Sequence, residues 1–212
     1  GKKFGMISVI IHEVGHNFFP MIVNSDEREW IWMDEGFNTF MQYIAEHEWS
    51  QDYPARRGSP RTIGGYMKSA NQVPIMTSAD SLIQSSANAY SKTAAGLIIL
   101  RETILGREIF DFAFKEYARR WKFKRPMPAD FFRTMEDASG VDLDWFFRGW
   151  FYTIDHTDIA IRDVTRYRVD SNNPAEKKAR DRKKSERAND TISKRRSVNL
   201  PKRIDAFPEL KD

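Results

Sequence analysis

The chain has 212 residues, of which 41% are hydrophobic, and it contains no cysteine. A chain of this length can bury a hydrophobic core, and we expect one domain with an appendage. The lack of cysteine excludes disulfides and thiolate ligands, so any metal ion must be held by His, Asp or Glu. No apolar run approaches the roughly 20 residues that span a bilayer, and the first residues show no secretory signal, so no membrane span is predicted.

The net charge of +4 is concentrated near the C-terminus, where residues 171–203 carry 12 basic and 4 acidic side chains. The rest of the chain is therefore mildly acidic. Such a polar segment cannot bury enough apolar surface to offset its ordering entropy, so residues 171–199 are predicted to be a charged, disordered linker. Binding of nucleic acid by this tail is a weaker alternative, because its mixture of Lys, Arg, Glu and Ser contains no recognisable motif.

Apolar residues recur at helical spacing through most of the body. The first predicted helix covers residues 5–19 and ends before Pro20; its buried stripe would be Ile7, Ile10, Ile11, Val14 and Phe18. A second helix is predicted over residues 33–49, followed by an irregular connection over residues 50–66 that is rich in Pro and Gly. A third helix is predicted over residues 88–105 and is closed by Gly106.

Three more helices are predicted, over residues 108–121, up to Gly140, and after Asp142. Beyond Tyr152 the pattern changes, since Ile159, Ile161 and Val164 alternate as in a short strand. We therefore expect residues 154–170 to be an exit segment with a possible strand. Residues 200–212 would be the possible start of a following domain.

The segment His12-Glu13-Val14-Gly15-His16 is an H-E-x-x-H motif. On a helix its two histidines lie one turn apart on one face, where both imidazoles can reach one ion. Glu35 follows His16 by 19 residues and is the candidate third ligand. Three protein ligands leave the fourth position of a zinc ion to water, as a catalytic site requires. A structural metal site is the alternative, but it would normally be closed by four protein ligands and would not need Glu13.

Glu13 follows the first ligand directly, so it lies near the metal without being needed to hold it. Zinc lowers the pKa of bound water to about 7, and a nearby carboxylate can take its proton and later deliver it to the leaving amine. Glu13 is therefore predicted to be the general base. The remaining histidines, His47 and His156, are expected to be surface or packing residues.

The spacing H-E-x-x-H-x18-E resembles the aminopeptidase N family of gluzincin metallopeptidases. Other segments are similar to family blocks: residues 32–37 (WMDEGF) to the block around the third ligand, residues 89–92 (AYSK) to the Y-x-K block, and residues 142–150 to the closing helix. The resemblance implies a mainly α, thermolysin-like catalytic domain over residues 5–153, with a Zn²⁺ cofactor. It also implies that Tyr90 stabilises the oxyanion of the tetrahedral intermediate.

The resemblance further implies an aminopeptidase that hydrolyses N-terminal peptide bonds of peptide substrates through a zinc-bound water. The chain departs from the family at Thr93, where Gly is usual, at Gln42, where Glu is frequent, and in the segment of residues 17–20 after His16. These departures affect the surroundings of the ligands more than the ligands themselves. Bacterial relatives are often exported, which gives only a weak indication of location.

The family's G-x-M-E-N segment, whose Glu grips the free amine of the substrate, does not occur in this sequence. The first residue is not Met, and we expect the chain to be an excerpt of a longer enzyme whose N-terminal domain is its partner and supplies that segment. Two alternatives stay open: an endopeptidase of the thermolysin type, whose ligand spacing is one residue longer, and a non-catalytic zinc-binding or scaffold domain.

Overall fold

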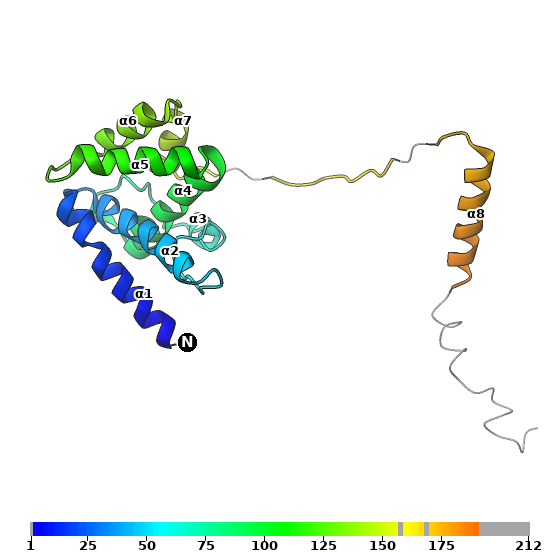
Figure 1. The fold of residues 1–212 in the computed structure, drawn as a ribbon, viewed down its shortest axis with the longest axis horizontal. Coiled ribbons are helices and arrows are strands. Elements are labelled where there is room, and N and C mark those ends of the chain that lie inside the picture. The colour runs from blue at the N-terminus through cyan, green and yellow to red at the C-terminus, as the bar shows by residue number, and fades with distance from the viewer. Residues whose placement is uncertain (1, 157–158, 168–169, 191–212) are drawn as a thin grey trace, which may run out of the picture. The chain divides into compact units, whose positions relative to one another are not determined.

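Helices are the only regular secondary structure in the described part of the chain, and no strand occurs within it (Figure 1). The computed structural model describes residues 2–156, 159–167 and 170–190. The chain divides into two units, Gly1–Asp158 and Ile159–Asp212. The helices of the first unit are α1 (Lys2–Gly15), η1 (Asn17–Ile22), η2 (Trp32–Gly36), α2 (Phe37–Trp49), α3 (Gly64–Met67), η3 (Ala79–Ser81), η4 (Ser86–Lys92), α4 (Thr93–Ile99), η5 (Leu100–Ile104), α5 (Arg107–Trp121), α6 (Pro128–Ser139), α7 (Asp144–Phe147) and η6 (Arg148–Tyr152). The prediction of a mainly α fold is therefore confirmed.

The first helix ends earlier than the sequence pattern predicts. Helix α1 stops at Gly15, and the predicted end lies inside the short π-helical segment η1. Phe19 adopts an extended conformation (φ −123°, ψ 110°) immediately before Pro20. Steric conflict with the proline ring disfavours helical backbone at the preceding residue, which explains the interruption. The chain consequently turns away directly after the second histidine of the motif.

An aromatic core fixes the segment that follows. Trp32 is fully buried and contacts Phe37 (ring centroids 5.4 Å apart) and Phe151 (4.9 Å). Phe37, also fully buried, lies 4.8 Å from Phe131. Burial of side chains of this size stabilises a fold by about 2 to 3 kcal/mol each. Because Trp32 and Phe37 stand at the start of η2 and of α2, the core holds both sides of the segment that contains Glu35.

The packing of α1 on α2 brings the histidines close to Glu35, which is distant from them in the sequence. Helix α1 packs along α2, and α5 packs on α6. The approach of α1 to α2 is close, because a Cβ atom added at Gly15 would lie only 1.9 Å from Oδ1 of Asn38. Asn38 also donates a hydrogen bond from Nδ2 to the carbonyl oxygen of His12 (2.7 Å). This contact ties the histidine helix to the helix that follows Glu35.

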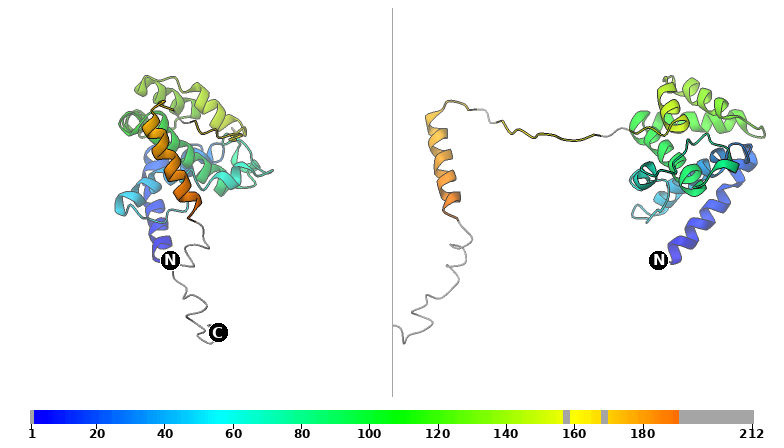
Figure 2. Two further views of the ribbon diagram at one scale, coloured as in Figure 1. Left: turned by 90° about the vertical axis from the view of Figure 1, so that its right-hand side faces the viewer. Right: turned by 180° about the vertical axis from the view of Figure 1, so that it is seen from behind.

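The prediction that the apolar stripe of the first helix is buried is wrong. Ile10, Val14 and Phe18 are 54%, 60% and 55% exposed. The face of α1 that packs on α2 is instead the one with His12 and Gly15. The views from other sides show the N-terminal half of α1 extending beyond the other helices of the unit (Figure 2). The periodicity correctly predicted a helix with an apolar face, but within the described residues nothing covers that face.

The second unit contains one described helix, α8 (Pro174–Ala188). This helix lies within the segment predicted to be a charged, disordered linker, residues 171–199. Residues 191–199 lie outside the described part of the chain, as does the predicted start of a domain at 200–212. Asn173 caps α8 by accepting a hydrogen bond from the backbone of Ala175 (3.0 Å), and Pro174 occupies the first turn. Capping and a composition rich in Ala, Lys, Arg and Glu favour a helix locally, even where no side chain is buried.

The described residues of the exit segment form no strand, and Ile159, Ile161 and Val164 are each more than 80% exposed. A strand needs a neighbouring strand to satisfy its backbone groups, and the described residues offer none. None of the helices described is both long enough and apolar enough to cross a bilayer.

Candidate metal centre

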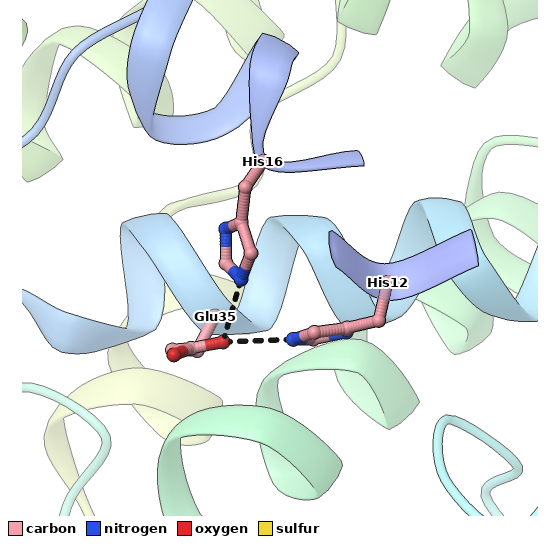
Figure 3. A group of neighbouring side chains, drawn as sticks. All are labelled: His12, His16 and Glu35. Atoms are coloured by element: carbon pink, nitrogen blue, oxygen red, sulfur yellow. Dashed lines mark hydrogen bonds and ion pairs between the residues drawn. The ribbon is translucent and has the colours of Figure 1, made fainter. Parts of the chain in front are cut away.

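Three side chains converge at the junction of α1, η2 and α2 (Figure 3). His12 and His16 come from the last turn of α1 and the residue after it, and Glu35 comes from η2. Nε2 of His12 lies 3.0 Å from Oε2 of Glu35, and Nε2 of His16 lies 3.4 Å from the same oxygen. The structure thus brings together the three residues that the motif and its spacing single out as ligands.

The separation of these atoms fits a zinc ion. Zinc binds imidazole nitrogen and carboxylate oxygen at about 2.0 to 2.2 Å, so two ligand atoms at a tetrahedral angle lie about 3.3 Å apart. The observed distances of 3.0 and 3.4 Å bracket this value. Two neutral imidazoles and one carboxylate are also a ligand set that catalytic zinc sites use. These three residues would hold the ion and leave one position open.

Gln42 fixes the orientation of His12. Its side chain donates from Nε2 to Oε1 of Glu46 (2.7 Å), and its Oε1 lies 2.9 Å from Nδ1 of His12. A carboxylate can only accept, so the amide nitrogen of Gln42 must face Glu46 and the amide oxygen must face the imidazole. Nδ1 of His12 therefore carries a proton, and Nε2, which faces Oε2 of Glu35, is the nitrogen that can offer its lone pair to a metal.

His16 is oriented in a different way. Its Nδ1 donates to the carbonyl oxygen of Phe19 (2.9 Å), and Oδ1 of Asp34 lies 3.0 Å from the same nitrogen. The hydrogen bond goes to Phe19, because Oδ1 of Asp34 lacks a well-aligned donor. Nε2 of His16 is again left free for a metal. Burial, together with the charge of Glu35, raises the pKa of Asp34 to about 7.

The ligands shift the pKa values of one another. Burial disfavours the charged form of His12, but hydrogen bonds to Glu35 and Gln42 outweigh it and raise the pKa of His12 above its usual range. Burial likewise disfavours the charged form of Glu35, but the neighbouring imidazoles and the hydroxyl of Tyr90 hold the pKa of Glu35 below its usual range. Glu35 is therefore kept as an anion, as a metal ligand must be.

A cavity of about 470 Å³ opens over the three ligands and is lined by the other two predicted site residues, Glu13 and Tyr90. Glu13 is exposed, whereas Tyr90, on η4, is half-buried. The ring of Tyr90 stacks on that of His12, with centroids 5.8 Å apart and planes at 17°. Burial and the neighbouring Glu35 carboxylate raise the pKa of the Tyr90 hydroxyl, so it stays protonated and able to donate.

The sequence did not reveal several residues of this site. Gln42 was identified only as a departure from a family pattern, and nothing pointed to Glu46, although the two lie one helical turn apart on α2. Arg56 and Arg57 also line the cavity, from the connection that was predicted only to be irregular. The one signal that could have found Glu46 was its place four residues after Gln42 on the predicted second helix.

The two remaining histidines of the chain are not in this cluster. Nδ1 of His47 bonds the carbonyl oxygen of Tyr43 (2.7 Å), and His156 is exposed. A second group of carboxylates, Glu136, Asp142 and Asp144, also lies within metal-binding distances. Glu136 accepts a hydrogen bond from the backbone of Leu143 (2.8 Å), so a local turn accounts for its position.

The domain model of peptidase family M1 matches residues 2–150, more than half of the chain. This chain belongs to peptidase family M1. The predicted family resemblance is thereby confirmed. Among its relatives, the glutamyl aminopeptidase of Sus scrofa is 26% identical over 165 residues, which are 74% of this chain and 17% of that protein. Aminopeptidase N of Lactococcus lactis subsp. lactis is 25% identical over 157 residues, 67% of this chain and 18% of the relative.

Solved structures of the family share the fold of this chain. The M1 zinc metallopeptidase from Deinococcus radiodurans matches with a TM-score of 0.60 at 18% identity, over 71% of this chain and 34% of that one. A mutant of that enzyme with a bound Tyr-Ser-Ala substrate gives a TM-score of 0.60 at 17% identity. The chain therefore spans less than a fifth of these two curated relatives and about a third of this solved M1 metallopeptidase.

Proposed function

We propose that this M1 chain is the catalytic part of a zinc aminopeptidase, in which His12, His16 and Glu35 hold Zn²⁺. The observation that carries the proposal is the convergence of two imidazole Nε2 atoms on one oxygen of Glu35, at 3.0 and 3.4 Å. Zinc in such a site would lower the pKa of water and polarise the carbonyl of the scissile bond.

Glu13 and Tyr90 would carry out the steps that involve protons and charge. Glu13 faces the cavity beside the ligands, where its carboxylate can take a proton from the attacking water and pass it to the leaving amine. The protonated hydroxyl of Tyr90 can donate to the oxygen on which negative charge develops. Gln42 and Phe19 hold the two imidazoles with Nε2 directed at the ion, so little rearrangement is needed when zinc binds.

A further part of the protein would complete the active site. The exposed face of α1, formed by Met6, Val9, Ile10 and Val14, is apolar and adjoins the cavity through Val9. Contiguous apolar surface of this kind is commonly covered by another domain or partner. We infer that an N-terminal domain of the same parent chain covers this face and supplies the group that recognises the amine of the substrate.

The test uses the complete protein that contains this sequence. It should bind one zinc ion per active site and release N-terminal amino acids from peptides, and a chelator should abolish the release. Glu13→Gln should keep the zinc and lower kcat by at least about 10²-fold, since general-base catalysis contributes 10²- to 10⁴-fold. Glu48→Gln, an exposed carboxylate on α2 outside the cavity, is the matched control.

Two outcomes would contradict the proposal. Full activity of the Glu13→Gln variant would exclude Glu13 as the base. Equal cleavage of free and N-acetylated peptides would show an endopeptidase, because an aminopeptidase requires the free amine.

A further inference from the structure

Two neighbouring arginines, Arg56 and Arg57, stand at the rim of the cavity over the metal ligands. Both are exposed. The same two residues also line a second hollow of about 720 Å³, whose other lining residues include Ser69, Ser85 and Ser86. A peptide that is cut at the metal centre and continues into this hollow would pass the arginine pair.

The loop that carries the arginines is anchored on both sides of them. The hydroxyl of Tyr53, a buried residue, donates to the carbonyl oxygen of Phe4 (2.6 Å) and lies 2.9 Å from Oγ of Ser8, so it ties the loop to α1. Gly58 has φ +86°, and a Cβ atom there would lie 3.0 Å from the Cβ of Tyr43 on α2. Contacts with α1 and α2 thus fix the loop immediately before and after the arginine pair.

The position of Arg57 relative to the metal ligands follows from two ring contacts. Its guanidinium carbon lies 4.7 Å from the ring centroid of Tyr90, and that ring lies 5.8 Å from the ring of His12. The guanidinium is therefore at most about 10.5 Å from the His12 ring. An extended peptide advances about 3.3 to 3.6 Å per residue, so Arg57 is within about three residues of a bond held at the metal centre.

The charges of this pair are not neutralised by the described part of the chain. Within it, no carboxylate lies within ion-pair distance of Arg56 or Arg57, in contrast to Arg101 and Arg120, which pair with acidic groups. Among the described residues, Arg57 makes one hydrogen bond, from Nη2 to Oγ of Ser86 (3.1 Å). A guanidinium has five N–H donors in a planar fork that suits a carboxylate, so most donors of Arg57 remain available.

We propose that Arg56 and Arg57 form a subsite that binds a carboxylate of the peptide substrate, located within about three residues of the bond that is cleaved. This inference rests on the proposed peptidase function. The carboxylate could belong to an Asp or Glu side chain or to the C-terminus of a short peptide. Both sources present the same two oxygens to the guanidinium fork, and the bond formed is a charge-assisted hydrogen bond.

Stacking of Arg57 on Tyr90 could also serve only to position that ring. The two roles predict different results. A subsite for carboxylates changes the preference between charged and neutral substrates, whereas a purely positioning role changes the rate with all substrates by the same factor. The preference would also decrease with ionic strength, because the arginines are exposed and salt screens such charges.

The experiment compares kcat/KM of the zinc-loaded complete protein for matched peptides. Ala-Glu-Ala amide against Ala-Gln-Ala amide tests a side-chain carboxylate, and trialanine with a free C-terminus against its amide tests the terminal one. We expect the carboxylate to raise kcat/KM roughly three- to tenfold in at least one pair, as exposed charge-assisted contacts do. In Arg57→Gln, and more completely in the Arg56→Gln/Arg57→Gln double variant, this ratio should fall to about one.

Arg61→Gln is the matched control, because Arg61 is exposed on the same loop but lines neither hollow. It should leave the ratio as in the unmodified protein. Ratios of one in both peptide pairs with the unmodified protein, or a preference that survives the double variant, would overturn the carboxylate subsite while peptide cleavage itself stands. Absence of zinc-dependent cleavage of every peptide, neutral ones included, would instead refute the proposed function and this inference with it.

Discussion

Replacing Gln42 by methionine removes the contact that sets the tautomer of His12. Methionine has a similar size and can fill the same space, but it accepts only weakly from Nδ1 of His12 and cannot donate to Glu46. Loss of such a partner of a ligating histidine typically weakens metal binding 10- to 100-fold, or about 1.4 to 2.7 kcal/mol. We expect zinc affinity to fall by this amount. The measurement is a competitive titration against a chromophoric chelator at fixed pH, with circular dichroism to confirm that the variant is folded.

The exchange of the two partners provides the control. In Gln42→Glu/Glu46→Gln, the carboxylate at position 42 can accept both from His12 and from the new amide, so the two hydrogen bonds of position 42 are restored. Zinc affinity should return to within about threefold of the unmodified protein, since the hydrogen-bond pattern is restored. A folded Gln42→Met variant that binds zinc as tightly as the unmodified protein would refute the orienting role. If the exchanged pair binds as weakly as Gln42→Met, the loss of affinity has a less specific cause.

Three further substitutions test other parts of the structure. Gly15→Ala should destabilise the fold by about 1 to 3 kcal/mol in urea unfolding, because its Cβ would clash with Asn38, and adding Asn38→Ala should recover part of the loss. Tyr90→Phe should keep the zinc but lower kcat by about 10²- to 10³-fold in peptide hydrolysis, as removal of an oxyanion donor does. Burial lowers the pKa of Lys92 to about 8 from its usual 10.5, so above pH 8 the unfolded chain binds more protons than the folded one. The free energy of unfolding should therefore rise between pH 8 and 10.5 by up to about 3 kcal/mol relative to Lys92→Met.

The residues of the site differ in how far they could be predicted from the sequence. His12, His16 and Glu13 lie on one helix, where spacing alone defines which side chains share a face. The approach of Arg57 to Tyr90 depends on the path of an irregular loop, and no local pattern encodes that path. The ligand spacing thus predicts the chemistry, whereas substrate recognition depends on tertiary contacts.

The errors in the fold have physical causes as well. The apolar stripe of α1 was predicted to be buried because a monomeric domain usually covers such a face, yet no described residue covers Ile10 or Val14. The helix α8 was not predicted because the segment has too few apolar residues to form a core. A capped helix rich in charged residues can form without a buried core. In both cases, the error came from an assumption about which residues are buried, which a local sequence pattern does not determine.

Contacts with the protein core, rather than the metal ion, hold the ligand side chains in place. This leads to a prediction about metal removal. Glu35 is held between Trp32 and Phe37, two fully buried aromatic residues of one continuous core. The histidines are oriented by Gln42 and by the carbonyl of Phe19. None of these contacts requires zinc, unlike those of small domains that fold only around their metal.

We therefore expect the chelator-treated protein to keep its helical circular dichroism signal and a cooperative thermal transition. Zinc should raise the transition temperature by the amount that its binding free energy dictates, which grows with the logarithm of the free zinc concentration. Loss of the helical signal on chelation at 25 °C would mean that the ion holds the fold together. The site would then be structural, and the roles proposed for Glu13 and Tyr90 would lose their basis. Because a structural site has no need of a base beside it, this one measurement distinguishes a catalytic from a structural zinc site at the same three ligands.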